Sequence, residues 1–161
     1  YEAAPMHDVD KVAIPDLILL KPGKLTAEEF ELMKRHALMG HEILRGSSSP
    51  KLQAAAVIAL SHHEKHDGSG YPNGLSGDDI PLHGRIVAVA DVFDALTSER
   101  PYKRAWTLDQ AATHLREQAG SHFDPRCTNA FFSIWEEAKA IHDRYRDEPI
   151  APPPPGVGDL A

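Results

Sequence analysis

The sequence predicts an all-α fold, and three observations predict it. Apolar residues recur at spacings of three and four along most of the chain, which is the period that buries one face of a helix. Capping residues precede these stretches, and Gly or Pro follows them. No stretch alternates apolar and polar residues with the period of two that a half-buried strand requires.

The first long helix is expected over residues 27–45. Thr26 and Glu29 have the spacing of a capping box at its start, and Gly46 marks its end. The apolar stripe of this helix is formed by Phe30, Met33, Ala37 and Leu44. We expect the stripe to face the core.

The next two helices are expected over residues 50–66 and 83–99. Pro50 suits the first turn of one helix, and Pro101 ends the other. The apolar positions of the first of these helices are Leu52, Ala55, Ala56, Ile58 and Ala59. Those of the second are Ile86, Val89, Ala90, Phe93 and Leu96. Residues 67–74 between them hold too many Gly and Pro residues for regular structure, so we expect a loop there.

Two further helices are expected in the last part of the domain. Thr107 begins one that ends at Gly120, and Asp124 followed by Pro125 begins the last one. The apolar side of the last helix is formed by Phe131, Phe132, Ile134, Trp135 and Ile141.

Composition narrows the classes of protein that the chain can belong to. Of its 161 residues 42% are hydrophobic, which is enough for one core. The longest apolar run, residues 54–60, is far shorter than the roughly 20 residues that cross a bilayer. We therefore expect no membrane segment. The single Cys127 cannot form an internal disulfide, which fits a reducing compartment, so we expect a cytoplasmic protein. A net charge of −7 argues against DNA as a partner.

We expect one domain over residues 1–148 and a disordered tail over residues 149–161. The tail contains four consecutive prolines and has no hydrophobic period. The first residue is Tyr1 rather than an initiator Met, so we expect the domain to be a segment of a longer protein.

Candidate metal ligands lie on or beside several of the expected helices: His7, Asp8, His36, His62, His63 and Asp91. Helical bundles build metal sites from His and carboxylate side chains that project inward from facing helices. A single His-Asp pair is common by chance, and a lone His is more often a packing residue than a metal ligand, so each is weak evidence for a metal site when taken alone. The adjacent His62 and His63 are a stronger signal, because two imidazoles need dedicated partners. Asp91, between Ala90 and Val92, would need either a metal ion or a buried hydrogen bond.

The motifs that contain these residues follow one another in a characteristic order. They are His7-Asp8-Val9-Asp10-Lys11, Lys21-Pro22-Gly23-Lys24-Leu25-Thr26, His62-His63-Glu64 with Asp67-Gly68-Ser69-Gly70-Tyr71-Pro72, and Ala90-Asp91-Val92-Phe93-Asp94-Ala95-Leu96-Thr97 with Arg100-Pro101-Tyr102-Lys103. In order and spacing they resemble the HD-GYP family over residues 3–123. The resemblance implies an HD-type helical bundle that lacks its first helices.

The resemblance also implies roles for individual residues. The metal ligands would be His7, Asp8, His36, His62, His63 and Asp91, and they would hold two or three divalent ions, iron or manganese. Asp8 would bridge two of the ions, and Lys11 would lie beside the scissile phosphate or the attacking water. The substrate would be contacted by Gly70, Tyr71, Pro72, Arg100 and Lys103.

The activity that the resemblance implies is hydrolysis of cyclic di-GMP to linear pGpG, to GMP or to both. The domain would be the output domain of a bacterial signalling protein, such as a response regulator with a receiver or other sensor domain before Tyr1. A diguanylate cyclase and a second copy of the chain are further candidate partners.

Two departures from the family pattern leave alternatives open. Asp10 stands where the family usually has Gly, and the family places a further His, often with a Glu, on a helix upstream of His7. A domain that binds cyclic di-GMP or docks a partner without turnover is therefore one alternative. An HD hydrolase of another nucleotide is a second, although it leaves the Gly70-Tyr71-Pro72 loop unexplained.

Overall fold

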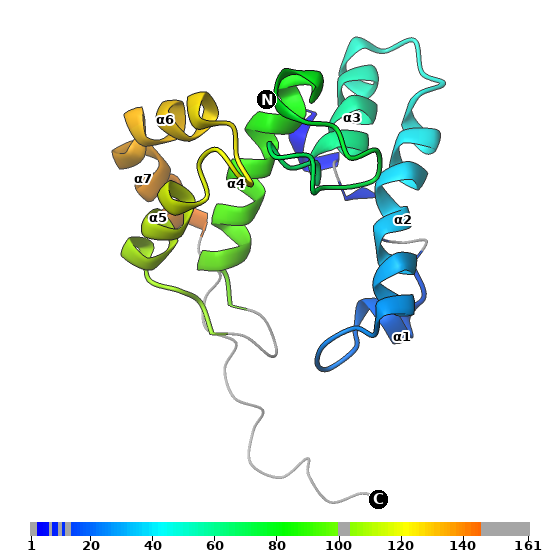
Figure 1. Ribbon diagram of the computed structural model, residues 1–161, viewed down its shortest axis with the longest axis horizontal. Helices are drawn as coiled ribbons and strands as arrows, with labels where there is room; N and C mark the ends of the chain where they lie inside the picture. The colour runs from blue at the N-terminus through cyan, green and yellow to red at the C-terminus, as the bar shows by residue number, and fades with distance from the viewer. Residues whose placement is uncertain (1–2, 7, 10, 12–13, 100–103, 146–161) are drawn as a thin grey trace, which may run out of the picture.

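The computed structural model describes residues 3–6, 8–9, 11, 14–99 and 104–145, and they form a helical domain (Figure 1). The described residues contain no strand, so the all-α prediction is confirmed. In chain order the elements are the 3-10 helix η1 (Ala4–Met6), α1 (Asp16–Leu19), α2 (Ala27–Leu44), α3 (Pro50–Ser61), the 3-10 helix η3 (Gly77–Asp79), α4 (Leu82–Thr97), α5 (Leu108–Glu117), α6 (Pro125–Ser133) and α7 (Trp135–Tyr145).

Helix α2 begins at the expected capping box. The Thr26 hydroxyl accepts a hydrogen bond from the Glu29 backbone N–H at 3.2 Å, and the Glu29 carboxylate accepts one from the Thr26 N–H at 2.7 Å. Lys21 adds an ion pair to the same carboxylate at 2.5 Å. The start of α2 is thereby fixed, and its end at Leu44 is one residue before the predicted end.

Helices α3 and α4 are shorter than predicted at their C-terminal ends. Helix α3 ends at Ser61 rather than near His66, with His62 as its C-cap residue. Helix α4 ends at Thr97 rather than at residue 99, because Ser98 takes an extended conformation with φ −90° and ψ 140°. The two helices approach closely at Gly84, where a Cβ atom would lie 2.8 Å from the Cβ of Ser61.

The last predicted helix is two helices. The backbone leaves the helical region at Ile134, with φ −112° and ψ 26°, and separates α6 from α7. Ile134 and Ile141 are exposed, so their assignment to the buried side of one continuous helix was wrong. Thr107 is the N-cap of α5, as expected, and the helix begins at Leu108. It ends at Glu117, three residues before the predicted end at Gly120.

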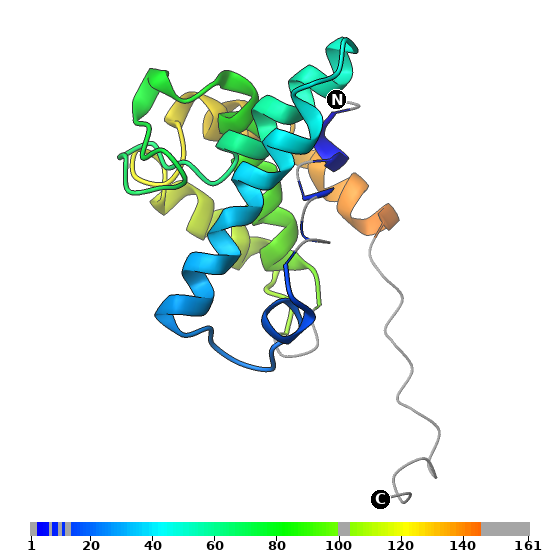
Figure 2. The ribbon, with the colours of Figure 1, turned by 90° about the vertical axis from the view of Figure 1, so that its right-hand side faces the viewer.

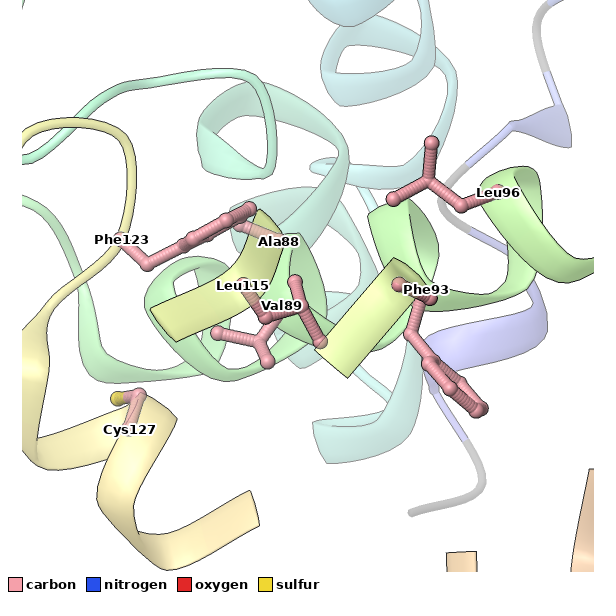
Figure 3. Packing of buried hydrophobic residues seen from close by; sticks show 8 residues of the cluster. Ala88, Val89, Phe93, Leu96, Leu115, Phe123 and Cys127 are labelled. Carbon is pink, nitrogen blue, oxygen red and sulfur yellow. The ribbon is translucent and has the colours of Figure 1, made fainter. Parts of the chain in front are cut away.

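Helix α4 lies at the centre of the domain. Figure 1 shows it between α2 and α3 on one side and α5, α6 and α7 on the other, and Figure 2, turned by 90°, shows α2 in front of it. One apolar cluster joins α4 to α5, α6 and the turn at Phe123 (Figure 3): Ala88, Val89, Phe93, Leu96, Ala111, Leu115, Phe123 and Cys127. A second cluster joins α4 to the N-terminal segment, α2 and α3: Ala3, Leu44, Ala55, Ala56, Ile58 and Val87.

Three further predicted apolar positions lie at the surface instead. Phe30 of α2 is 46% exposed, Ile86 of α4 is 51% exposed, and Ala90 of α4 is exposed as well. Among the described residues, no helix combines the length and the apolar character that a membrane crossing needs.

Candidate metal centre

Four of the predicted ligands lie together in the structure. Asp8, His36, His62 and His63 each offer one ligand atom, and these atoms all lie within 4.8 Å of one another. Asp8 comes from the N-terminal segment, His36 from the middle of α2, and the His pair from the end of α3. The early end of α3 therefore puts both imidazoles where the chain turns out of the helix.

Backbone carbonyl groups orient two of the imidazoles. His36 Nδ1 lies 2.7 Å from the Met33 carbonyl oxygen, and His62 Nδ1 lies 3.0 Å from the carbonyl oxygens of Ile58 and Ala59. In both rings Nδ1 therefore carries the proton and donates it, which leaves the Nε2 lone pair for another partner.

Both Nε2 atoms are directed at the carboxylate of Asp8. His36 Nε2 lies 3.8 Å from Asp8 Oδ1 and His62 Nε2 lies 3.9 Å from the same oxygen. These distances exceed hydrogen-bond length but match donor atoms that share an ion at about 2.0–2.2 Å from each. His36 Nε2 is buried and has no hydrogen-bond partner among the described residues. The four residues thus fit a divalent metal ion with nitrogen and oxygen ligands.

The imidazole of His63 is held in its neutral form, which is the form that binds metal. Burial, and then the neighbouring His62 and His36, lower its pKa to about 3 against the smaller opposing effects of Asp91 and Asp8. Its ring centroid lies 3.9 Å from that of His62 and 4.8 Å from that of His36.

Lys11 lies at the edge of the group. Its ammonium forms an ion pair with Asp8 Oδ2 at 2.5 Å, while Oδ1 is the oxygen that faces the imidazoles. The two oxygens of Asp8 therefore face different partners, and a cation lies beside the ligand group with its side chain 39% exposed.

Tyr71 brings the loop after α3 into the site. Its ring stacks on His63 with centroids 4.7 Å apart and planes 28° apart. Burial, and then the negative charges of Asp8 and Asp91, raise the pKa of its phenol, so the hydroxyl stays protonated. The aromatic residue of the loop is thus part of the wall of the metal centre.

Glycines allow the loop to take this position, for two different reasons. Gly68 has φ 83°, a conformation that other residues rarely adopt. Gly70 has no positive φ; a Cβ atom there would lie 2.5 Å from Cα of Glu64 and closer still to the Lys65 nitrogen. Gly70 is therefore required by contact with the chain that follows the His pair, which the sequence alone did not reveal.

Glu64 is a residue that sequence reasoning missed. Its buried carboxylate accepts hydrogen bonds from the backbone N–H of Asn73 at 2.7 Å and of Leu75 at 3.0 Å. It ties the far side of the loop to the end of α3, beside the ligands but outside the ligand group. The signal in the sequence was a carboxylate that directly follows a ligand pair and precedes a loop with many N–H groups to satisfy.

The remaining predicted site residues divide into two sets. Asp91 lies half-buried on α4, close enough to influence the pKa values of His63 and Tyr71, but it is not part of the four-residue group. Residues outside the described part of the chain are His7, Asp10, Arg100 and Lys103. His41 of α2 lies outside the ligand group, with its Nδ1 3.1 Å from the Ala56 carbonyl oxygen.

Comparisons with known proteins agree with this arrangement. The HD domain family matches residues 1–127. The chain is 62% identical over 128 residues to the cyclic di-GMP phosphodiesterase response regulator RpfG of Xanthomonas campestris. The aligned residues cover 80% of this chain and 34% of the relative. It is 51% identical to a cyclic di-GMP phosphodiesterase of Thermotoga maritima, over 91% of this chain and 40% of the relative. It is 54% identical to 3'3'-cGAMP-specific phosphodiesterase 2 of Vibrio cholerae, over 86% of this chain and 27% of the relative.

The chain thus spans about a third of the length of the curated relatives it matches. The match over most of its residues and the assembly of the His and Asp motifs at one centre lead to the same assignment. The resemblance drawn from the motifs is confirmed, and the chain belongs to the HD domain family.

Proposed function

We propose that this domain hydrolyses a phosphodiester bond of a cyclic dinucleotide, with cyclic di-GMP as the first substrate and pGpG, GMP or both as products. One observation carries the proposal: Tyr71 of the loop stacks on His63, one of the four residues of the ligand group of Asp8, His36, His62 and His63. Metal ions at the phosphate promote phosphodiester hydrolysis, and an aromatic surface beside them favours binding of a nucleobase.

We propose a binuclear centre with iron or manganese. Asp8, His36, His62 and His63 would hold the ions together with His7 and Asp91, and Asp8 would be the shared ligand. When bound, such ions would make hydroxide available near neutral pH and would offset the negative charge that builds on the phosphate oxygens. Mixed nitrogen and oxygen ligands without a thiolate favour iron or manganese over a structural zinc site.

The protein side chains position the substrate around this centre. The Lys11 ammonium, held beside Asp8, attracts a phosphate oxygen and orients the attacking water. Tyr71 closes one wall and excludes water from the ligand group. Arg100 and Lys103 supply further positive charge for the phosphate or for guanine, which a domain with a net charge of −7 needs locally.

The place of the domain in signalling is part of the proposal. One relative is named a response regulator, so we propose that a receiver or other sensor domain controls this domain from its N-terminal side. A diguanylate cyclase, a second copy of the chain and a cytoplasmic location remain predictions.

A second substrate, 3'3'-cGAMP, is favoured by one observation. The relative that is 54% identical to this chain is named a phosphodiesterase specific for that dinucleotide. Both substrates carry the same phosphodiester linkage type and at least one guanine, so the metal chemistry is common to the two and the choice depends on contacts to the bases.

The test is a hydrolysis assay on purified protein whose metal content has been measured. Protein loaded with Fe(II) or Mn(II) should convert cyclic di-GMP to pGpG or GMP, and the His62→Ala variant should lose both bound metal and turnover. Metal-loaded protein that binds cyclic di-GMP but leaves both dinucleotides intact would be a receptor. Turnover of other nucleotides alone would assign a different HD hydrolase activity.

A further inference from the structure

A cluster of side chains on α2 lies next to Tyr71. It consists of Phe30, Glu31 and Lys34, called the α2 cluster below. Phe30 was predicted to be a core residue, yet nearly half of its surface is exposed, and the side chain of Glu31 is 70% exposed. An exposed aromatic ring beside a charged pair at the edge of a catalytic site is a surface that can contact a ligand.

Aromatic contacts connect this cluster to the metal centre. The Tyr71 ring stacks on His63 at 4.7 Å and meets the Phe30 ring edge-on, with centroids 6.2 Å apart and planes 82° apart. Two ring contacts, from His63 to Tyr71 and from Tyr71 to Phe30, therefore connect a ligand imidazole to an exposed side chain. A base attached to a phosphate at the ligand group extends away from the metal centre, and the Tyr71 and Phe30 rings are the aromatic surfaces on that path.

The charged pair of the cluster lies over the same rings. Lys34 Nζ is 5.4 Å from the Phe30 centroid and 5.9 Å from the Tyr71 centroid. The same nitrogen forms an ion pair with Glu31 Oε1 at 2.5 Å. A donor cation and an acceptor carboxylate are thus fixed side by side next to two aromatic rings.

This arrangement matches the hydrogen-bonding edge of guanine. Guanine presents the acceptors O6 and N7 and the donors N1–H and N2–H2, so an ammonium and a carboxylate side by side complement it. Adenine has no N1–H and offers the carboxylate only N6–H2 on this edge, so it would form fewer hydrogen bonds with this pair than guanine does.

We propose that the α2 cluster is a guanine subsite. Phe30 packs against the base, Lys34 donates to O6 and Glu31 accepts from N1–H and N2–H2. This inference rests on the proposed function, because it assumes a cyclic dinucleotide at the ligand group. It assigns base selectivity to side chains of α2, separate from the loop motif and from Arg100 and Lys103.

The test compares Glu31→Gln and Lys34→Met on three substrates: cyclic di-GMP, 3'3'-cGAMP and cyclic di-AMP. Each variant should lower kcat/KM for cyclic di-GMP by about tenfold, mainly through KM, as expected for loss of one base-specific contact. The loss should be smaller for 3'3'-cGAMP, which has one guanine, and smallest for cyclic di-AMP, which has none. Metal content and kcat should stay at the wild-type level.

The matched control is the other ion pair with the same spacing on α2. Glu42 and Arg45 form an exposed pair at 2.8 Å near the opposite end of the helix. Glu42→Gln and Arg45→Met should leave all three kcat/KM values unchanged. Equal losses on every substrate, or no loss in the two cluster variants, would overturn the subsite.

Failure of the proposed function gives a different result. If the wild-type protein hydrolyses none of the three dinucleotides, the enzyme assignment fails, and the same variants are compared by calorimetric binding. Weaker binding of cyclic di-GMP but not of cyclic di-AMP to Glu31→Gln would still support the subsite. Absence of any binding to wild-type protein would overturn both.

Discussion

A single carboxylate holds the substrate loop against the end of α3. Glu64 is 2% exposed and accepts hydrogen bonds from the N–H groups of Asn73 and Leu75. Replacement by Gln keeps the shape but turns one acceptor into a donor that faces an N–H group. We expect Glu64→Gln to lower the free energy of unfolding by about 2 kcal/mol, the range of hydrogen bonds to charged groups.

Urea unfolding measures that loss, and hydrogen exchange locates it. The amide protons of Asn73 and Leu75 should lose protection in the Glu64→Gln variant. Glu42→Gln, at an exposed position on α2, should change stability by no more than about 0.5 kcal/mol. Unchanged protection at both amides would show that another contact holds the loop.

At the residue scale the sequence predicted which candidate ligands lie together better than it predicted their supporting contacts. Asp8, His36, His62 and His63 were predicted as ligands from their motifs, and their ligand atoms lie together. Glu64 and Phe30 were not recognised, because one depends on which backbone groups the loop turns inward and the other on which part of an apolar stripe stays uncovered. Both are decided by tertiary contacts rather than by local pattern.

At the scale of elements, an ion-pair network links η3, α4 and α6. Asp124, the N-cap of α6, is paired with Arg85 of α4 at 2.7 Å and with Arg126 at 2.8 Å, and Asp78 of η3 is paired with both arginines. Hydrogen bonds from Arg126, and then from Arg85, hold the pKa of the Asp124 carboxyl well below its usual range. The network thus stabilises the domain while Asp124 is ionised.

The sign of the resulting pH dependence follows from that pKa. A carboxyl with a lower pKa in the folded than in the unfolded state stabilises the fold above about pH 4 and loses this contribution as the pH falls further. Asp124→Asn should reduce stability at pH 7 by about 3 kcal/mol, because Arg85 loses a buried partner. The difference from wild type should narrow between about pH 4 and pH 2.

Urea unfolding of both proteins across this pH range measures the difference. Asp79→Asn, at the exposed neighbour of Asp78, is the control and should follow the wild-type curve. A difference between Asp124→Asn and wild type that stays constant down to pH 2 would contradict the ionic origin of the stabilisation.

Helix starts were predicted more accurately than helix ends. The capping box at Thr26, Pro50 at the first turn of α3, and Asp124 with Pro125 each define a start through local contacts, and each start is where the sequence placed it. The ends at Ser61 and Thr97 and the break at Ile134 depend on where the chain must turn to pack against other elements. Local sequence carries little information about those turns.

At the scale of the whole molecule, the ligand group connects elements that are separate in sequence. Asp8, His36 and His62 belong to the N-terminal segment, α2 and α3, which also share the apolar cluster around Ala55. A metal ion bound by all three favours the folded state, because the unfolded chain cannot hold its ligands together. Stability should therefore depend on metal concentration as well as on packing.

We expect metal removal to lower the Tm by about 5–10 °C, since an ion at a hundred times its Kd contributes about 2.7 kcal/mol. Differential scanning calorimetry with and without a chelator measures the shift. His36→Ala should abolish it, while His41→Ala should retain it, because His41 is a histidine of the same helix that is bonded to the Ala56 carbonyl group outside the ligand group. If His36→Ala and wild type shift equally, the ion that stabilises the fold is bound elsewhere, and the ligand group of Asp8, His36, His62 and His63 is not the metal centre.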